Sequence, residues 1–377
     1  MSWPKPKVID TLKPPVKLHS GRWFLFFIIL IFITGMILAL MWPNNNYSKQ
    51  WTFWAGTIFI SSMIGGIAIG IRFYLYGLAQ EEYEIWQHEQ KHIAQNWQAW
   101  AMKSLVVLDS YYHLPNQITI QQLLTDSANL EIQINKSLTF DDTVELHQHI
   151  EDLFFSIHHQ LSIIPVTETI NITVYSSNDA YNYIDDDIHR AYKAVKIVQP
   201  YTLTHQIMPS ANPDKLTEWI DSTQTGLQLV IINNTISSGT AFLCAFLLMD
   251  KQHYLDLAID IAQSEILRPM VTDDLFIGVN QMVEMQPATH QINQLWFANL
   301  DHKQEVNIAK QLAELNISPE QIYKLESLVG NQTELSYWLS LALGCEMVTK
   351  TKQNNLIAAV SHNQWLFSVV TTVSGES

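Results

Sequence analysis

Two apolar runs without a charged residue, Phe24–Met41 and Thr52–Ile71, dominate the beginning of the chain. A bilayer core of about 30 Å needs roughly 20 helical residues, so each run is long enough to cross it. Only a short polar segment, 43–50, separates the two runs, and it has room for no more than a tight turn between antiparallel helices. The pattern predicts a transmembrane helical hairpin over residues 23–76.

The residues that flank these runs predict how the hairpin lies in a bilayer. The segment 1–22 is a basic, proline-containing tail with five Lys or Arg residues, whereas the connection between the runs carries only Lys49. The positive-inside rule then places the N-terminus and the C-terminus of this multi-pass protein in the cytoplasm, with the connection between the helices outside. A cleaved signal peptide is less favoured, because a second apolar run follows at once. Aromatic rings prefer the headgroup level, which predicts four membrane-interface residues: Trp23, Trp42, Trp51 and Trp54.

Small residues recur every four positions on the second run, at Ser62, Gly66 and Gly70, with Ser61 and Gly65 beside them. Such a stripe lets another backbone approach closely. We expect it to pack against the first helix, and the alternative is a contact with a partner membrane protein or a second copy of the chain.

The pattern changes twice after the membrane segment. Residues 77–110 show helical spacing of aromatic and aliphatic positions, which predicts an amphipathic juxtamembrane helix. Residues 111–377 alternate strand-like and helix-like segments, so we expect one α/β globular domain. Expected strands are 170–175, 227–232, 240–249, 294–298, 356–360 and 365–373, and expected helices include 138–163, 255–266, 318–328 and 334–345.

Composition narrows the classes of partner. The net charge is −15, and all of the acidic residues except Asp10 lie beyond the membrane segment. An acidic domain is repelled by phosphate backbones, so nucleic acid is disfavoured and protein or small-molecule partners remain, beside the lipid bilayer itself. The two cysteines, Cys244 and Cys345, do not have the spacing of metal ligands, and two cysteines are too few for a disulfide framework. We expect no cofactor.

One short motif points to a metal. His88-Glu89-Gln90-Lys91-His92 matches the pattern in which two histidines one helical turn apart bind zinc and the glutamate acts as general base. The motif lies on a charged, glutamine-rich helix without an evident third ligand. We therefore favour solvated histidines and expect no metal site, with His88 and His92 as the ligands if the metalloprotease alternative holds.

The order of elements over 227–373 resembles the C-terminal half of the thiolase-like fold of β-ketoacyl synthases. The residues that carry the resemblance are a strand hairpin (227–249), a segment from Lys324 to Gly330-Asn331 that leads into an apolar helix (334–345), and a closing hairpin. The resemblance implies a thiolase-like mixed sheet, with Ser176-Ser177 near the position of the family's nucleophilic cysteine. This chain has Asn331 where the family has a catalytic histidine, and serines in place of the cysteine. Without thiolate and imidazole, decarboxylative condensation lacks its nucleophile and its oxyanion donor.

The first third of the chain is also similar to two-pass inner-membrane proteins encoded within bacterial type VI secretion clusters. This similarity is carried by the basic tail, the hairpin and the aromatic positions that follow Arg72. Together the two resemblances favour a membrane-anchored, non-catalytic binding or scaffold protein, as an accessory of a type VI secretion system. We expect other membrane or secretion components as its partners, with a homo-oligomer as a further option. The alternative is a membrane-anchored acyl-transferase or hydrolase of thiolase-like fold, with Ser176, Ser177 and Asn331 as candidate catalytic residues.

Overall fold

The computed structural model describes residues 3–4, 12–41, 50–140, 146–176, 184–222, 226–235 and 239–373. The chain divides into two compact units. The helical unit is Lys5–Asn96, and the globular unit is Trp97–Ser377 together with Met1–Pro4. The second apolar run and the expected juxtamembrane helix are parts of one continuous helix, which ends at Ala101 rather than near residue 110.

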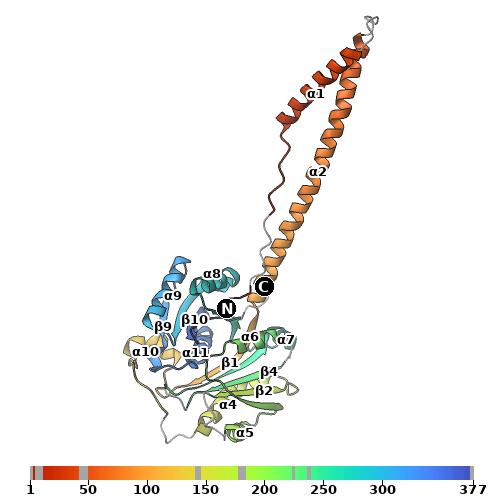
Figure 1. Ribbon diagram of the computed structural model, residues 1–377. Helices are drawn as coiled ribbons and strands as arrows, with labels where there is room; N and C mark the ends of the chain where they lie inside the picture. The colour runs from red at the N-terminus through yellow and green to blue at the C-terminus, as the bar shows by residue number, and fades with distance from the viewer. Residues whose placement is uncertain are drawn as a thin grey trace. The chain divides into compact units, whose positions relative to one another are not determined.

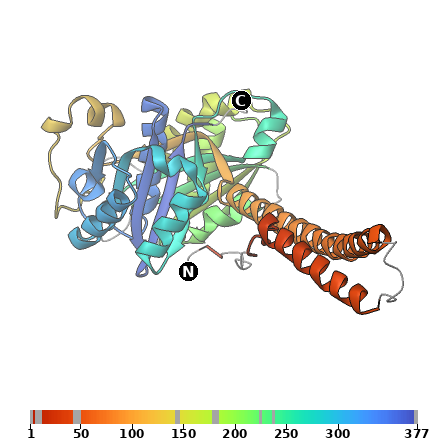
Figure 2. The ribbon, with the colours of Figure 1, turned by 90° about the horizontal axis from the view of Figure 1, so that it is seen from above.

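The helical unit consists of helix α1 (Ser20–Met41) and most of helix α2 (Gln50–Ala101). Both helices are long and apolar enough to cross a membrane, judged by length and composition. Their apolar side chains are largely uncovered by protein; Phe32 is 77% exposed and Phe59 is 70% exposed. Figures 1 and 2 show α1 beside the first part of α2.

The contact between α1 and α2 corrects the predicted packing stripe. Ser61 Oγ donates to Thr34 Oγ1 at 2.9 Å, and both side chains are buried. A Cβ atom on Gly65 would lie 2.6 Å from the tip of the Phe27 ring, so a larger residue at this position would require the ring to move. The predicted stripe of Ser62, Gly66 and Gly70 is exposed instead, because one residue along a helix turns the side chain by about 100°.

The predicted membrane-interface tryptophans are placed in part. Trp51 is 81% exposed and Trp54 is 57% exposed, while Trp23 is partly exposed and Trp42 lies outside the described residues. Their position at a headgroup layer stays a prediction.

The globular unit is built on one mixed sheet of eleven described strands. The strands are β1 (Ser104–His113), β2 (Ile170–Ser176), β3 (Tyr201–Ile207), β4 (Leu227–Asn233), β5 (Leu243–Asp250), β6 (Ser264–Leu267), β7 (Met270–Thr272), β8 (Ile292–Ala298), β9 (Gln321–Lys324), β10 (Asn354–Ser361) and β11 (Gln364–Thr371). The helices are α3 (Ile120–Thr125), α4 (Leu146–Ile163), α5 (Ile184–Val195), α6 (Asp214–Asp221), α7 (Lys251–Leu257), α8 (Leu275–Met285), α9 (His302–Glu314), α10 (Leu325–Val329) and α11 (Ser336–Thr351).

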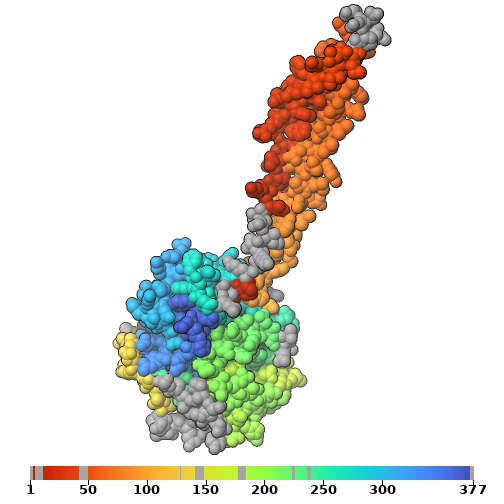
Figure 3. Space-filling view, viewed as in Figure 1, coloured from red at the N-terminus to blue at the C-terminus, as the bar shows by residue number. Residues whose placement is uncertain are grey.

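The strand order shows an internal duplication. Across the sheet the order is β3-β2-β4-β5-β1 and then β6-β11-β10-β8-β9. If the main strands of each half are numbered 1 to 5 along the chain, leaving out the short β7, both halves have the order 3-2-4-5-1 when read from the outer edge inward. In each half the fifth strand is antiparallel to its neighbours. The two halves meet where β1 pairs antiparallel with β6, and they lie side by side in Figure 3, green beside cyan and blue.

Helices cover both faces of the sheet. Helices α4, α5 and α7 lie against the first half on one face, and α8 and α9 cover the second half. On the opposite face α11 packs against strands of both halves, and twelve of its sixteen residues are buried. The core is therefore three-layered, with α11 as its most buried helix.

Several expected elements differ from the structure. The expected helix 255–266 is mostly loop followed by strand β6, and 318–328 contains strand β9 before α10. Leu138–Phe140 is not helical, and strand β3 was not predicted. The resemblance had placed the hairpin 227–249 in the C-terminal half of a thiolase-like fold. In the structure this hairpin, β4 and β5, belongs to the first half of the duplication instead. The closing hairpin is confirmed; His362 and Asn363 have φ of 48° and 63°, as a type I′ turn requires.

The observed stripe on α2 can be tested by disulfide cross-linking. We expect Thr34→Cys with Ser61→Cys to form a disulfide on mild oxidation, because the two hydroxyl oxygens are within hydrogen-bond distance. Thr34→Cys with Ser62→Cys is the matched control and should form little. Mass spectrometry of the joined peptides measures both, and equal cross-linking of the two pairs would contradict the packing described here.

Candidate functional site

A pocket lies where strand β1 loses its neighbour on one side. Of the residues of β1, only Ser104–Val107 pair with β6, and from Asp109 onward β1 pairs with β5 alone among the described strands. A register shift between Val107 and Asp109 marks a β-bulge at this point. Bulges re-aim side chains and are frequent beside active sites. The free edge of β1 therefore opens a space between the sheet and α11.

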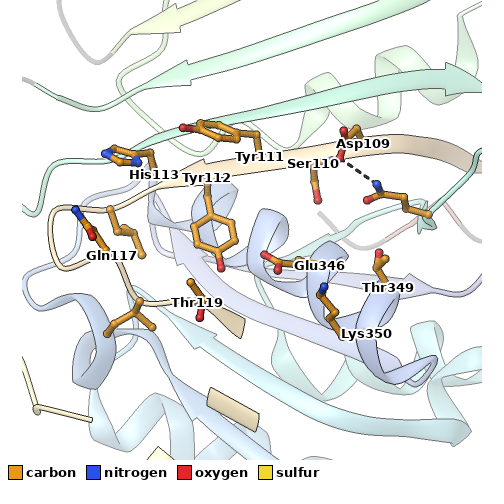
Figure 4. Close-up of a pocket in the computed structure, with 13 residues that line it drawn as sticks. Asp109, Ser110, Tyr111, Tyr112, His113, Gln117, Thr119, Glu346, Thr349 and Lys350 are labelled. Carbon is orange, nitrogen blue, oxygen red and sulfur yellow. Dashed lines mark hydrogen bonds between the residues drawn. The ribbon is translucent and has the colours of Figure 1, made fainter. Parts of the chain in front are cut away.

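This pocket has a volume of about 580 Å³. Its polar wall comes from β1 (Asp109, Ser110 and Tyr112) and from α11 (Glu346, Thr349 and Lys350). Figure 4 shows Tyr112 pointing from the strand toward Glu346, with Thr349 and Lys350 further along the helix. Two acids, a cation and phenolic groups thus converge on one solvent-accessible space.

Asp109 is a buried acid in the wall of the pocket. Only 9% of the residue is exposed, and burial raises the pKa of its carboxyl from 3.8 to about 6. Two hydrogen bonds work against this rise, one from the Ser110 N–H at 2.8 Å and one from Gln263 Nε2 at 3.0 Å (dashed in Figure 4). The Glu346 carboxylate adds a smaller rise, and His159 a small fall. A carboxyl group with a pKa near 6 can both take and give a proton close to neutral pH.

Tyr112 and Glu346 form a second polar pair in the pocket. Burial raises the pKa of Tyr112, and the neighbouring Glu346 carboxylate raises it further. The Tyr112 hydroxyl accepts from the backbone N–H of Ile120 at 3.1 Å, which ties the strand to the start of α3. Tyr112 therefore stays neutral and holds its hydroxyl in a fixed place.

His113 continues the pocket wall beyond the tyrosines. Its ring lies 4.3 Å from the ring of His149 on α4, measured between centroids, and Phe140 stacks on it at 5.2 Å. Burial lowers the pKa of both histidines, so two neutral imidazoles pack together here. Within the described residues, no group of three or more His, Cys, Asp or Glu residues is arranged to hold a metal ion.

The predicted nucleophile Ser176 has a partner that the sequence analysis did not identify. Ser176 is the last residue of β2, and its Oγ is hydrogen-bonded to Nε2 of His205 on the parallel strand β3 at 3.1 Å. Both residues lie near the carboxyl ends of parallel strands, where ligands bind in open α/β sheets. Ser176 is only 3% exposed. Ser177 lies outside the described residues.

Asn331 has structural partners. Its side chain donates to Ser137 Oγ at 2.9 Å, and its backbone N–H donates to Lys136 O at 2.7 Å. Gly330 before it has φ of 85°, and a Cβ atom there would lie 2.1 Å from Lys136 O. The described contacts of Asn331 are thus those of a brace between two loops, and Asn331 does not line the pocket on β1.

Neither the histidines of the metal motif nor the cysteines line the pocket. His88, Glu89 and His92 are exposed on α2, and the His92 ring lies beside Asn96 Nδ2 at 3.3 Å. Cys244 and Cys345 are fully buried, and burial raises the pKa of each thiol, that of Cys345 to about 12. Neither cysteine is a thiolate near neutral pH.

Asp109, Glu346 and His205 were not among the residues predicted from the sequence. A signal existed for the first two, because each is an acid inside an apolar segment, Leu105–Leu108 before Asp109 and Leu341–Cys345 before Glu346. Acids are rarely buried without a reason. No signal in the sequence identified His205, since its contact depends on the register of β2 with β3.

Comparison with known proteins finds likeness in structure only. No protein-family model and no curated protein matches the sequence. A ketosynthase–acyl-carrier-protein complex of type II polyketide synthesis (AntDE:AntF) has a TM-score of 0.49 at 10% identity, over 72% of this chain and 100% of that one. The 3-oxoacyl-[acyl-carrier-protein] synthase III of Aquifex aeolicus has a TM-score of 0.45 at 11% identity, over 71% and 99%. The OleA protein of Xanthomonas campestris with bound cerulenin has a TM-score of 0.45 at 8% identity, over 72% and 97%.

These findings correct the main functional hypothesis. The mixed α/β sheet matches that of thiolase-like neighbours, at an identity that concerns the fold alone. The hypothesis of a non-catalytic scaffold finds no support in these comparisons, and the alternative of an acyl-transferase or hydrolase is kept as a proposal. The similarity to type VI secretion proteins has no support from the comparisons.

The raised pKa of Asp109 predicts a pH-dependent stability. In the native state Asp109 holds its proton up to about pH 6, whereas the unfolded chain releases it near 3.8. Native stability therefore falls as pH rises between these values, by about 3 kcal/mol at about 1.4 kcal/mol per pKa unit. Asp109→Asn removes this loss and keeps an oxygen for the two donors. We expect the variant to match the wild type at pH 4 and to gain several degrees in Tm at pH 8.

Thermal unfolding of the full chain in detergent between pH 4 and 8 measures this gap. Asp214→Asn, on an exposed first turn of α6, is the matched control and should show no pH-dependent gap. A constant difference between Asp109→Asn and the wild type at every pH would contradict the burial argument.

Proposed function

We propose that the globular unit is an acyl-transferase or hydrolase in which Asp109 transfers the proton. The observation that carries this proposal is a buried carboxyl, with a pKa of about 6, in the wall of a solvent-accessible pocket of about 580 Å³. Acid–base catalysis is most effective when the pKa of the catalytic group lies near the working pH. Perturbed carboxyls in clefts are candidates for this role.

The geometry supports a two-stage use of this carboxyl. In its ionised form Asp109 takes the proton of a water or hydroxyl group that attacks the acyl carbon, and in its protonated form it returns the proton to the leaving group. Lys350 follows Glu346 by one turn of α11 and offers a positive charge to the oxygen on which negative charge develops. Neutral Tyr112 accepts a hydrogen bond from the Ile120 N–H and so fixes the position of this part of the pocket wall.

A second candidate places the nucleophile at Ser176. Its hydrogen bond with His205 Nε2 at 3.1 Å is the arrangement in which an imidazole activates a serine for attack on an acyl carbon. The acyl group would then be held as an ester on Ser176 before transfer to water or to a second substrate. The low exposure of Ser176, 3%, favours the Asp109 pocket as the first site to test.

We further propose that the helical unit attaches this enzyme to a lipid bilayer. Two largely uncovered apolar helices and the basic tail support this location, and the distribution of Lys and Arg favours the cytoplasmic side of a bacterial inner membrane. Protein partners and self-association belong to this proposal as well, with the exposed small-residue face of α2 as the surface to examine.

The test is hydrolysis and transfer of acyl thioesters and esters by the full chain in lipid nanodiscs. We expect Asp109→Asn to lower kcat/KM by about a hundredfold or more, in line with loss of a general base. The rate of the wild type should rise with pH through about 6, as Asp109 ionises. Asp214→Asn is the control and should stay within about twofold of the wild type.

The variants separate the two candidates. Loss of activity in Asp109→Asn with activity kept in Ser176→Ala supports the pocket on β1, and the opposite result supports the Ser176–His205 pair. If both variants keep the activity of the wild type, or if the wild type turns over none of these substrates, the proposed function is wrong.

A further inference from the structure

Trp3, close to the start of the chain, is part of the globular unit. The residue is 7% exposed, and its indole Nε1 donates to the backbone carbonyl of Pro269 at 3.0 Å. In return, Nε2 of the buried Gln281 donates to the Trp3 carbonyl at 3.0 Å. Two directional hydrogen bonds and nearly complete burial of an indole are the contacts of a specific binding pocket.

The neighbours of Trp3 include the last turn of α2. The Trp3 ring meets the Trp100 ring edge to face at 5.8 Å, and Trp97 stacks on Trp100 at 4.6 Å. The guanidinium of the buried Arg268 lies 4.0 Å from the centre of the Trp100 ring, and Arg268 Nε donates to Trp100 O at 3.1 Å. All of these residues belong to the globular unit. The chain thus leaves the unit after Pro4 and re-enters it at Trp97, in one aromatic cluster.

We propose that Trp3 acts as a clasp that holds the N-terminus on the globular unit, so that the segment 5–96 is a closed excursion of the chain. A loop that starts and ends at one site on one side of a bilayer must cross that bilayer an even number of times. Given the membrane attachment proposed for the helical unit, the clasp therefore fixes α1 and α2 as a pair of crossings and keeps the N-terminus on the side of the globular unit. It also requires that the N-terminus is retained, because cleavage after α1 would release the Trp3 peptide.

This inference is independent of the positive-inside rule and of the proposed catalysis. The lysine distribution indicates which side of a membrane is preferred, whereas the clasp states only that two parts of the chain share a side. It rests on contacts within the globular unit, and it would hold whether or not Asp109 is catalytic. Activity measurements therefore do not enter its test.

The first experiment maps sidedness with a membrane-impermeant maleimide. Cys244 and Cys345 are fully buried and should stay silent in the folded protein, so single cysteines can be introduced into the full chain. We expect Lys13→Cys and Lys303→Cys to react from the same side of the membrane, and Ser48→Cys from the opposite side. Labelling of intact cells and of inverted vesicles distinguishes the sides, and the intact mass of the protein reports whether the N-terminus is retained.

The second experiment tests the clasp itself in the full chain. Loss of a buried tryptophan removes packing and two partners, so we expect Trp3→Ala to lower the Tm of the globular unit by about 5 °C or more and to speed protease cleavage before α1. Trp51→Ala is the matched control, because Trp51 is 81% exposed, and it should change neither quantity. Trp3→Phe should give a smaller loss, since it keeps the aromatic contact and loses the bond to Pro269.

Several outcomes would overturn the inference. These are reaction of Lys13→Cys and Lys303→Cys from opposite sides, reaction of all three cysteines from one side, an intact mass that lacks the N-terminus, and a Tm of Trp3→Ala equal to that of the wild type. A dimer that dissociates in Trp3→Ala would also overturn it, because Trp3 would then be bound by a second copy of the chain.

Discussion

The pairing of β1 with β6 is the constraint on which the globular unit depends. These two strands are the first of each half, and four residue pairs between them join the two five-stranded halves into one sheet. Because β6 is short, β1 continues past it with a free edge, and a bulge re-aims the strand at that point. The same feature that joins the halves therefore opens the pocket. A longer β6 would extend the pairing and fill the space beside Asp109.

Arg268 holds the elements around this joint in place. Its guanidinium is 1% exposed and forms two hydrogen bonds with the Asp221 carboxylate at the end of α6, at 2.7 and 2.5 Å. A third bond goes to Trp100 O, and the backbone N–H of Arg268 donates to Lys103 O at 3.1 Å. A buried charge is tolerated only when its hydrogen bonds are satisfied. Arg268, which directly follows β6, thus connects the end of α2 with the end of α6. The aromatic cluster that contains Trp3 packs beside it.

The chemistry of the globular unit differs from what its cysteines would suggest. Both thiols are buried among apolar side chains and hold their protons, so thiolate attack has no source among the described residues. A proton-transfer group is present, because burial raises the pKa of the Asp109 carboxyl to about 6, where it can exchange a proton near neutral pH. The Ser176–His205 pair adds a second, separate arrangement suited to acyl transfer. Both readings follow from side chains brought together by strand register, and neither requires a cofactor.

The sequence by itself determined the features that depend on local pattern. Two uncharged runs predicted α1 and the first part of α2, period-two and apolar segments predicted β2, β4, β5, β10 and β11, and a two-residue turn predicted the closing hairpin. Local pattern did not predict the elements that depend on tertiary contacts. Strand β3 is an edge strand of mixed polarity, and β6 and β9 are too short to show a period. The packing face of α2 lies one residue from the predicted stripe. The duplication is invisible in the residues because it is a property of strand order. The candidate site was decided by tertiary structure alone, since β1 and α11 are more than 200 residues apart along the chain. The pKa of Asp109 and the contacts of Ser176 and Trp3 arise only when these distant segments exclude water together.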